Sequence, residues 1–283
     1  MKAYKNLVLS GGSVRGVCHI GALTKLFESG CLNNLESYAG ASVGAIITCF
    51  LALGFSIAEI WDFIYKVDMA KLVDPNIMMF LTKFGVDEGN IMYDLIENIL
   101  IAKTGIKKIT FKQLHDFTNK TLTIIGSGLT TKTVIYYNHI NTPDFEVALA
   151  VRISISIPGF FTPVTIDDKK YIDGAILNNY PMNLYKDDLD NTIGILIVCD
   201  YDTDYQYPEQ YPFAVFNLFL YHNLMQTYNQ YEANTVYVDC SVEKEQVSHL
   251  NSGPIFNVDT KSKEILYKIG YDSSTKFLTK FTI

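Results

Sequence analysis

Charged side chains are scarce in this sequence, and positive ones are the scarcer kind. They make up 19% of the 283 residues, against about 25% in an average soluble domain. Lysine and arginine number 23 and aspartate and glutamate 30, which gives a formal net charge of −7. Because a nucleic-acid-binding protein needs a basic face to neutralise phosphates, this balance argues against a nucleic-acid partner. A hydrophobic content of 48% also excludes a disordered chain.

Cysteine provides neither a disulfide framework nor a zinc site. The five cysteines are an odd number without a CxxC pair, so we expect buried thiols in a reducing compartment. The N-terminal MKAYKNLVLSGG has no apolar signal region, and we expect a cytoplasmic protein. No DxDxDG loop and no His/Cys cluster has the spacing of metal ligands, so we predict neither a metal ion nor a cofactor.

A convincing membrane span is also missing. Residues 37–58, SYAGASVGAIITCFLALGFSIA, form 22 uncharged residues, and a span needs about 20 that are predominantly apolar. This stretch opens with small and polar residues, and only its middle is strongly apolar. We predict a buried strand, a tight turn and a buried helix. The uncharged stretch 210–231 carries several Gln, Asn and His side chains, which indicates an amphipathic helix.

Strands that alternate with helices are the main feature that is present. Strand 5–10 leads to helix 17–29, and strand 35–41 leads to helix 42–54, which is typical of a parallel α/β fold. A mainly helical region follows at 55–117. Further strands and helices are predicted at 121–138, 148–160, 169–176, 192–200, 212–231, 234–240 and 260–281. Because no linker, low-complexity tract or repeat interrupts this pattern, we expect one domain.

The sharpest local motif is a GxSxG, Gly40-Ala41-Ser42-Val43-Gly44. It follows a predicted strand and opens a predicted helix, which is the context of a nucleophile elbow. In such an elbow a strained turn exposes the serine hydroxyl, and the flanking glycines avoid clashes that a Cβ would make. The N-terminus of the next helix also favours developing negative charge. Ser42 is therefore a candidate nucleophile, and Gly40 and Gly44 are its candidate supports.

A second glycine-rich turn, Gly11-Gly12-Ser13-Val14-Arg15-Gly16, also lies between a strand and a helix. A Walker loop would end in GK[ST], and Gly16-Val17 does not match. A dinucleotide fingerprint would have glycine where Ser13 stands, and no acidic residue ends a suitable second strand. The turn is then either a backbone cradle for an anion or oxyanion, or a plain turn without a ligand.

The third motif is Asp173-Gly174-Ala175, within KKYIDGAILNNYP. An aspartate at the end of an apolar strand can lie in a site. Alone, however, aspartate before glycine is more typical of a surface turn.

Together the three motifs resemble those of the patatin-like phospholipase family. The similarity includes LSGGSVRGVCHIGAL at the first loop, VRISISIPGFFTPV before the DGA strand and NNYPM after it. It extends from about residue 5 to the C-terminal helix. The resemblance implies a single domain over 1–283 with a three-layer α/β/α fold around a mostly parallel sheet. It also implies a phospholipase A-type lipid acyl hydrolase without a cofactor.

The resemblance further implies a catalytic dyad. Ser42 is expected to attack an acyl ester and Asp173 to take its proton, with the N–H groups of Gly11, Gly12 and Ser13 as the oxyanion hole. Serine at position 13 departs from the family's usual glycine, which leaves the shape of the cradle open. The residues expected to support these groups are Arg15, Gly16, Gly40, Gly44 and Gly174.

Two alternatives stay open. In the chain order Ser…Asp…His, a conventional triad would add His222 or His249 to Ser42 and Asp173. His19 is expected to be a structural residue. The other alternative is a catalytically silent lipid-binding or interaction protein with the same fold.

Arginine occurs only twice, at Arg15 and Arg152, among 23 basic residues. Where lysine is the default, a retained arginine suggests a position that needs its planar fork. By the family resemblance Arg15 steadies the loop near the oxyanion.

A substrate of phospholipid or other acyl lipid implies contact with a membrane or micelle surface. Core packing is the expected role for most of the apolar clusters, with interfacial contact as the alternative. A lysine group is expected to form an ordinary solvated face, with anionic lipid as the alternative partner. The clusters are Ile77, Met78, Met79, Phe80 and Leu81; Tyr207, Tyr211, Phe213, Phe216 and Phe219; and the lysines Lys103, Lys107, Lys108 and Lys112.

Overall fold

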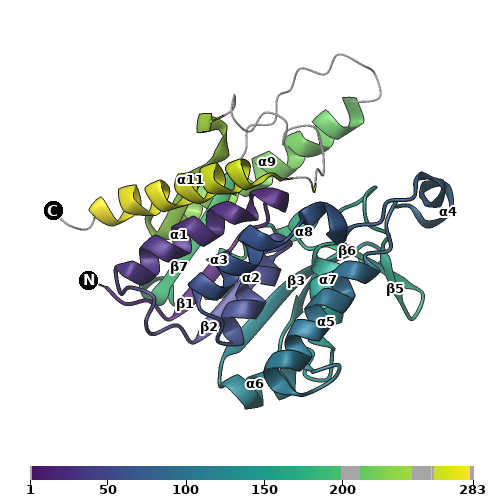
Figure 1. The fold of residues 1–283 in the computed structure, drawn as a ribbon, viewed down its shortest axis with the longest axis horizontal. Coiled ribbons are helices and arrows are strands. Elements are labelled where there is room, and N and C mark those ends of the chain that lie inside the picture. The colour runs from purple at the N-terminus through teal and green to yellow at the C-terminus, as the bar shows by residue number, and fades with distance from the viewer. Residues whose placement is uncertain (1, 199–210, 244–255, 257, 281–283) are drawn as a thin grey trace.

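A mostly parallel sheet forms the centre of the protein (Figure 1). The computed structural model describes residues 2–198, 211–243, 256 and 258–280, and within them the sheet has eight strands. The strand order is β5-β6-β3-β2-β1-β7-β8, with β4 paired to β3. The strands are β1 (Asn6–Leu9), β2 (Ser37–Ala41), β3 (Thr121–Gly128), β4 (Thr133–Tyr137), β5 (Val164–Ile166), β6 (Lys169–Asp173), β7 (Thr192–Val198) and β8 (Thr235–Asp239).

Helices cover both faces of this sheet (Figure 1). The longer ones are α1 (Val17–Glu28), α2 (Val43–Ala52), α3 (Ile57–Lys66), α5 (Asn90–Thr104), α6 (Phe111–Thr118), α7 (Val147–Ser154), α9 (Tyr211–Tyr231) and α11 (Thr260–Thr279). Short helices are α4 (Phe80–Lys83), α8 (Ala175–Asn178) and the 3-10 turns η1 (Ser13–Gly16), η2 (Met69–Leu72), η3 (Ile77–Met79), η4 (Met182–Tyr185), η5 (Leu189–Asn191), η7 (Glu232–Asn234) and η8 (Cys240–Glu243).

The alternation of side chains along β1 separates two cores. Leu7 and Leu9 belong to the larger core, which the sheet forms with α1, α2, α5, α7 and α11. Val8 points to the other face and packs with Tyr180 and Met182. These two cores confirm the predicted three-layer α/β/α arrangement with a mostly parallel sheet.

Strand β3 brings two distant segments together along one of its edges. Strand β4 pairs with residues 124–128 of β3, and β2 and β6 pair with residues 121–125 and 126–128. Since a strand has only two edges and β4 occupies one, β2 and β6 lie end to end along the other. Ala41 is opposite Ile125 and Asp173 is opposite Gly126. The residue after Ala41 therefore meets the last residue of β6.

Helices α1 and α11 lie side by side at very short range (Figure 1). A Cβ on Gly21 would come within 1.8 Å of the Tyr267 carbonyl oxygen, and one on Gly270 within 1.9 Å of the Cys18 carbonyl oxygen. Ser274 Oγ donates to a carbonyl of α1 over 3.0 Å. The two backbones can approach this closely only because both positions lack a side chain.

The predicted elements agree with the structure in order, with one informative difference. The uncharged stretch 37–58 forms β2, a turn and α2, as predicted. The helix predicted within 148–160 ends already at Ser154. The groups beyond it bond to neighbouring loops, as described below. Among the described helices, none combines the length and apolarity that crossing a bilayer requires.

The contact between α1 and α11 predicts an unusual effect for Gly270→Ala. Alanine is favoured over glycine in a helix interior by about 1 kcal/mol, so propensity alone would stabilise the variant. We expect the clash with the Cys18 carbonyl to prevail and to lower the free energy of unfolding by about 1–3 kcal/mol. Urea unfolding measures this free energy, and Lys276→Ala on the exposed side of α11 is the control. A Gly270→Ala protein as stable as wild type would contradict this packing.

Candidate active site

The turn at Ser42 has the geometry of a nucleophile elbow. Ser42 connects β2 to α2 with φ 53° and ψ −126°, a strained backbone for a residue with a side chain. A Cβ on Gly40 would come within 2.4 Å of the Gly44 backbone, and one on Gly44 within 2.5 Å of the Leu9 carbonyl oxygen. Both motif glycines are therefore required for the sharp turn, which holds Ser42 at the N-terminus of α2.

Ser42 and Asp173 are in direct contact, although 131 residues separate them. Ser42 Oγ donates to Asp173 Oδ2 over 2.9 Å, and the Ala175 N–H donates to the other carboxylate oxygen over 2.8 Å. The two side chains are 5% and 2% exposed. Burial raises the pKa of Asp173 from 3.8 to about 7, and the two hydrogen bonds oppose part of that shift. The carboxylate is thus more basic than usual and aimed at the hydroxyl.

Two serines, one at the end of α7 and one just beyond it, hold the elbow and the aspartate in register. Ser154 Oγ accepts from the Ser42 N–H over 2.9 Å, and the Ser154 carbonyl accepts from the Gly174 N–H over 3.3 Å. The Ser156 carbonyl accepts from the Asp173 N–H over 3.0 Å. Because these groups bond across the site, the chain leaves the helix at Ser154. The only local sequence signal of these serines is the alternation in RISISIP, which does not predict their roles.

Arg152 bonds to the same segment and to the loop that contains Glu88. Its Nε and Nη2 donate to the Glu88 carbonyl over 3.0 and 2.6 Å, and Nη1 donates to Ser156 Oγ over 2.6 Å. Nη2 also donates to the Thr162 carbonyl. Burial lowers the pKa of Arg152 to about 10. These contacts use the planar fork, which agrees with the prediction from the scarcity of arginine.

The glycine-rich turn lies directly against Ser42. A Cβ on Gly11 would come within 3.0 Å of the Ser42 Cβ, so glycine is needed there for space. The Gly11 N–H, predicted as an oxyanion donor, donates to Asn179 through its Oδ1 (2.8 Å) and its carbonyl (3.3 Å). The N–H groups of Gly12 and Ser13 have no partner among the described residues.

Position 13 has the backbone that a glycine would adopt without strain. The φ of Ser13 is 52°, in the left-handed region that favours glycine. The departure from the family's usual glycine therefore costs conformational energy while leaving the N–H in place.

The remaining predicted supports are close to these groups. Arg15 is 3% exposed, and its N–H donates to the Gly12 carbonyl over 3.1 Å. A Cβ on Gly16 would come within 2.3 Å of a Val43 methyl group, and one on Gly174 within 2.1 Å of the Ile125 carbonyl oxygen. Gly16 thus permits close contact between η1 and α2, and Gly174 permits close contact between the turn after β6 and β3.

The described histidines that form hydrogen bonds make them to groups other than the dyad. His19 is fully buried, its Nε2 contacts the Ser10 carbonyl over 2.8 Å, and burial lowers its pKa to about 4. His222 is exposed on α9, where its Nε2 contacts Gln226. His249 lies outside the described residues. Neither oxygen of Asp173 bonds to a histidine in the part of the chain that the structure describes.

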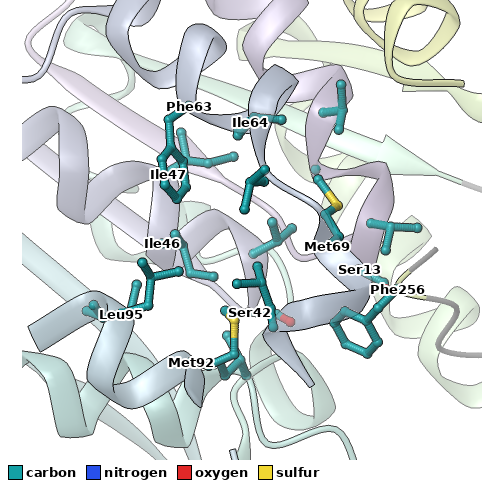
Figure 2. Close-up of a pocket in the computed structure, with 18 of the residues that line it drawn as sticks. Ser13, Ser42, Ile46, Ile47, Phe63, Ile64, Met69, Met92, Leu95 and Phe256 are labelled. Carbon is teal, nitrogen blue, oxygen red and sulfur yellow. The ribbon is translucent and has the colours of Figure 1, made fainter. Parts of the chain in front are cut away.

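A cavity of about 130 Å³ opens beside Ser42. Apart from Ser13 and Ser42 its side chains are apolar. Figure 2 shows Ser42 at one end, with Ile46 and Met92 beside it and Phe63 and Ile64 farther along. The cavity lies between α2, α3, α5 and the 3-10 turn η2. It therefore offers a water-poor channel that reaches the serine hydroxyl.

Most of the candidate lipid contacts that the structure describes are exposed. Core packing, the expected role of residues 77–81, is wrong for Ile77, Met78, Phe80 and Leu81, which are exposed. Tyr211, Phe216 and Phe219 of α9 are exposed as well, whereas Tyr207 and the side chain of Phe213 lie outside the described residues. The predicted solvated lysines are all exposed: Lys103, Lys107, Lys108 and Lys112.

Comparisons with known proteins give consistent matches. Residues 7–184 match the family model of the patatin-like phospholipases. An uncharacterized protein of Acanthamoeba polyphaga mimivirus is 33% identical over 98% of this chain and 94% of that protein. A probable lipid hydrolase of Invertebrate iridescent virus 6 is 31% identical, over 65% of this chain and 63% of that protein.

A solved structure supports the fold. The crystal structure of VipD from Legionella pneumophila matches 98% of this chain and 67% of its own, with a TM-score of 0.70 and 16% identity. The family match contains the glycine-rich turn, Ser42 and Asp173, and the mimivirus relative aligns over nearly the whole chain. The chain therefore belongs to the patatin-like phospholipase family.

Proposed function

We propose that this protein is a lipid acyl hydrolase that cleaves carboxylic esters through an acyl-enzyme on Ser42. The observation that carries the proposal is the 2.9 Å hydrogen bond from Ser42 Oγ to Asp173 Oδ2, made at one end of an apolar cavity. Family membership supports the same conclusion, as does the name of the iridescent virus relative, a probable lipid hydrolase.

In the first half of the reaction Ser42 Oγ attacks the ester carbonyl while its proton passes to Asp173 Oδ2. The raised pKa of Asp173 makes this transfer less unfavourable than it would be for an exposed carboxylate. Asp173 then gives the proton to the leaving alcohol as the C–O bond breaks. In the second half a water molecule loses its proton to Asp173 as its oxygen attacks the acyl-enzyme. Asp173 then returns the proton to Ser42 Oγ as the acyl C–O bond breaks, which releases the fatty acid and free Ser42.

The negative charge that forms on the carbonyl oxygen needs donors that are free before the reaction. We assign this role to the N–H groups of Gly12 and Ser13, which have no partner among the described residues. Gly11 gives space next to Ser42, and its own N–H fixes the turn to Asn179. The N-terminus of α2 adds a favourable potential at the same position.

The cavity supports an acyl chain as the group that is recognised. Its lining offers hydrocarbon contacts and, beyond the two serines, no polar side chain for a charged substrate. The ester would lie at Ser42 and its apolar tail between α2, α3 and α5. The substrate class that fits is an ester with an apolar acyl chain, such as a phospholipid.

Replacement of the nucleophile gives the first test. Ser42→Ala should lower kcat for ester hydrolysis by about 10³-fold or more and abolish labelling by a fluorophosphonate. Ser42→Gly should be equally inactive but should melt at a higher temperature than Ser42→Ala, because glycine adopts a φ of 53° without strain. An active Ser42→Ala protein would exclude Ser42 as the nucleophile.

The buried base predicts a specific pH dependence of activity. Since Asp173 must be ionised to accept a proton, kcat/KM should fall by about tenfold per unit well below its pKa of about 7. Asp173→Asn should be nearly inactive at every pH, whereas the control variants His222→Ala and His249→Ala should retain activity. If either histidine variant lost as much as Asp173→Asn, a triad would replace the dyad.

The same pKa predicts how stability changes with pH. Folding raises the pKa of Asp173, so the folded protein holds a proton between pH 3.8 and about 7 that the unfolded chain has released. This contribution to stability is present at low pH and is lost as the pH rises through about 7. Urea unfolding at pH 5 and pH 8 should therefore show wild type losing stability relative to Asp173→Asn at the higher pH. If the difference in the free energy of unfolding between the two proteins were the same at both pH values, the raised pKa would be contradicted.

Arg152 provides a test of the support behind the dyad. Lysine cannot reproduce the fork that bonds to the Glu88 carbonyl through two nitrogens and to Ser156 through a third. Arg152→Lys should lower kcat by about 10-fold with little change in KM, because the displaced groups position Asp173 and do not bind substrate. Lys112→Arg on α6, which is exposed, is the matched control. A variant with normal kcat would show that Ser156 is positioned without the fork.

A further inference from the structure

Residues 77–84 carry a concentration of exposed apolar side chains that the catalytic site does not use. Five large residues in this stretch are exposed, and the polar Thr82 and Lys83 stand among them. Such a group on a protein surface indicates a contact site. Their exposed fractions are Ile77 74%, Met78 71%, Phe80 47%, Leu81 80% and Phe84 60%.

The backbone of this stretch is anchored beside the cavity. The Asn76 N–H donates to the Val86 carbonyl over 2.6 Å, which joins the two ends of the stretch. The Val86 N–H donates to the Phe160 carbonyl over 2.7 Å. Gly85 packs against the backbone of Phe161, a residue of the cavity lining. On the other side the chain comes directly from η2, whose Met69 and Leu72 line the same cavity.

Beyond these anchoring bonds α4 projects away from the body of the protein, next to β5 and β6 (Figure 1). Lys170 of β6 lies over the ring of Phe84, with its Nζ 5.9 Å from the centroid. The exposed apolar side chains thus belong to a stretch whose two ends adjoin the lining of the cavity that reaches Ser42.

The backbone conformation of Phe84 is a second, independent observation that indicates a contact site here. Its φ is 61°, a left-handed backbone at the end of α4 that favours glycine or asparagine. The phenylalanine is mostly exposed, so burial in the core does not compensate for this strain. An aromatic side chain at this position is explained if it meets an apolar environment outside the protein.

We propose that residues 77–84 form a wedge that inserts into a lipid bilayer and brings the cavity mouth to the membrane surface. This inference rests on the proposed function, because the wedge would deliver the lipid whose acyl chain enters the cavity. Apolar side chains next to a hydrocarbon-lined channel fit the boundary between headgroups and acyl chains.

The charges around the wedge indicate that apolar insertion, and not attraction to anionic lipid, drives binding. Residues 71–88 contain two lysines and three acidic residues. Lys83 forms an ion pair with Glu88, so its charge is compensated locally. The wedge should therefore bind vesicles of phosphatidylcholine, and added phosphatidylserine or salt should have little effect.

The test compares wild type with two wedge variants and a matched control. The full-length protein is sedimented with phosphatidylcholine vesicles, and hydrolysis of the soluble ester p-nitrophenyl butyrate is measured in parallel. Ile77→Ser/Leu81→Ser should weaken vesicle binding by about tenfold or more and leave hydrolysis of the soluble ester unchanged. Leu218→Ser/Phe219→Ser, a pair on α9 that is also mostly exposed, should bind as wild type does.

Phe84→Asn separates a membrane role from a structural one. Asparagine tolerates the left-handed backbone, so the melting temperature should stay the same or rise while vesicle binding falls. A fall in melting temperature together with unchanged binding would overturn the proposal. So would equal vesicle binding by Ile77→Ser/Leu81→Ser and wild type, or a change only in oligomeric state on size exclusion with light scattering.

Failure of this inference and failure of the proposed function give different results. If the wedge is wrong but Ser42 is the nucleophile, wild type hydrolyses the soluble ester and the wedge variants bind vesicles normally. If the hydrolase assignment is wrong, wild type fails on the soluble ester whatever the vesicle binding shows.

Discussion

The contact between Ser42 and Asp173 depends on how the two edges of β3 are divided. Strand β4 takes one edge, and β2 and β6 share the other end to end. Because Ala41 and Asp173 are opposite consecutive residues of β3, the elbow after β2 must meet the end of β6. The hydrogen bond of 2.9 Å is thus a result of sheet register, and a shift of β6 by one residue would turn the carboxylate to the other face.

Strain and burial at this junction are tolerated because the surroundings are rigid. Ser42 and Ser13 both have positive φ, and Asp173 is almost completely removed from water. Glycines packed on backbone atoms and the bonds from Ser154, Ser156 and Arg152 fix the three loops. Burial in the large core on one face of the sheet and the smaller one on the other offsets these unfavourable features.

The sequence predicted those parts of the fold and site that have a local signal. The order of strands and helices follows from apolar periodicity, and the elbow follows from GxSxG between a strand and a helix. Asp173 is different, since aspartate before glycine usually marks a surface turn, and only the family resemblance singled it out. Ser154 had only the alternation in RISISIP as a local signal, and nothing local marked the role of Asn179, because their partners are 112 and 168 residues away. Residues 77–81 looked like core for the same reason: an apolar run does not reveal whether another element covers it.

The end-to-end placement of β2 and β6 also has a consequence for the order of biosynthesis. Asp173 leaves the ribosome 131 residues after Ser42, which takes on the order of 10 s at typical rates of translation. Throughout that interval β3 has no β6 beside it, and the serine hydroxyl has no base. On the proposed mechanism the growing chain is therefore inert toward the lipids of the cell that makes it until β6 has paired with β3.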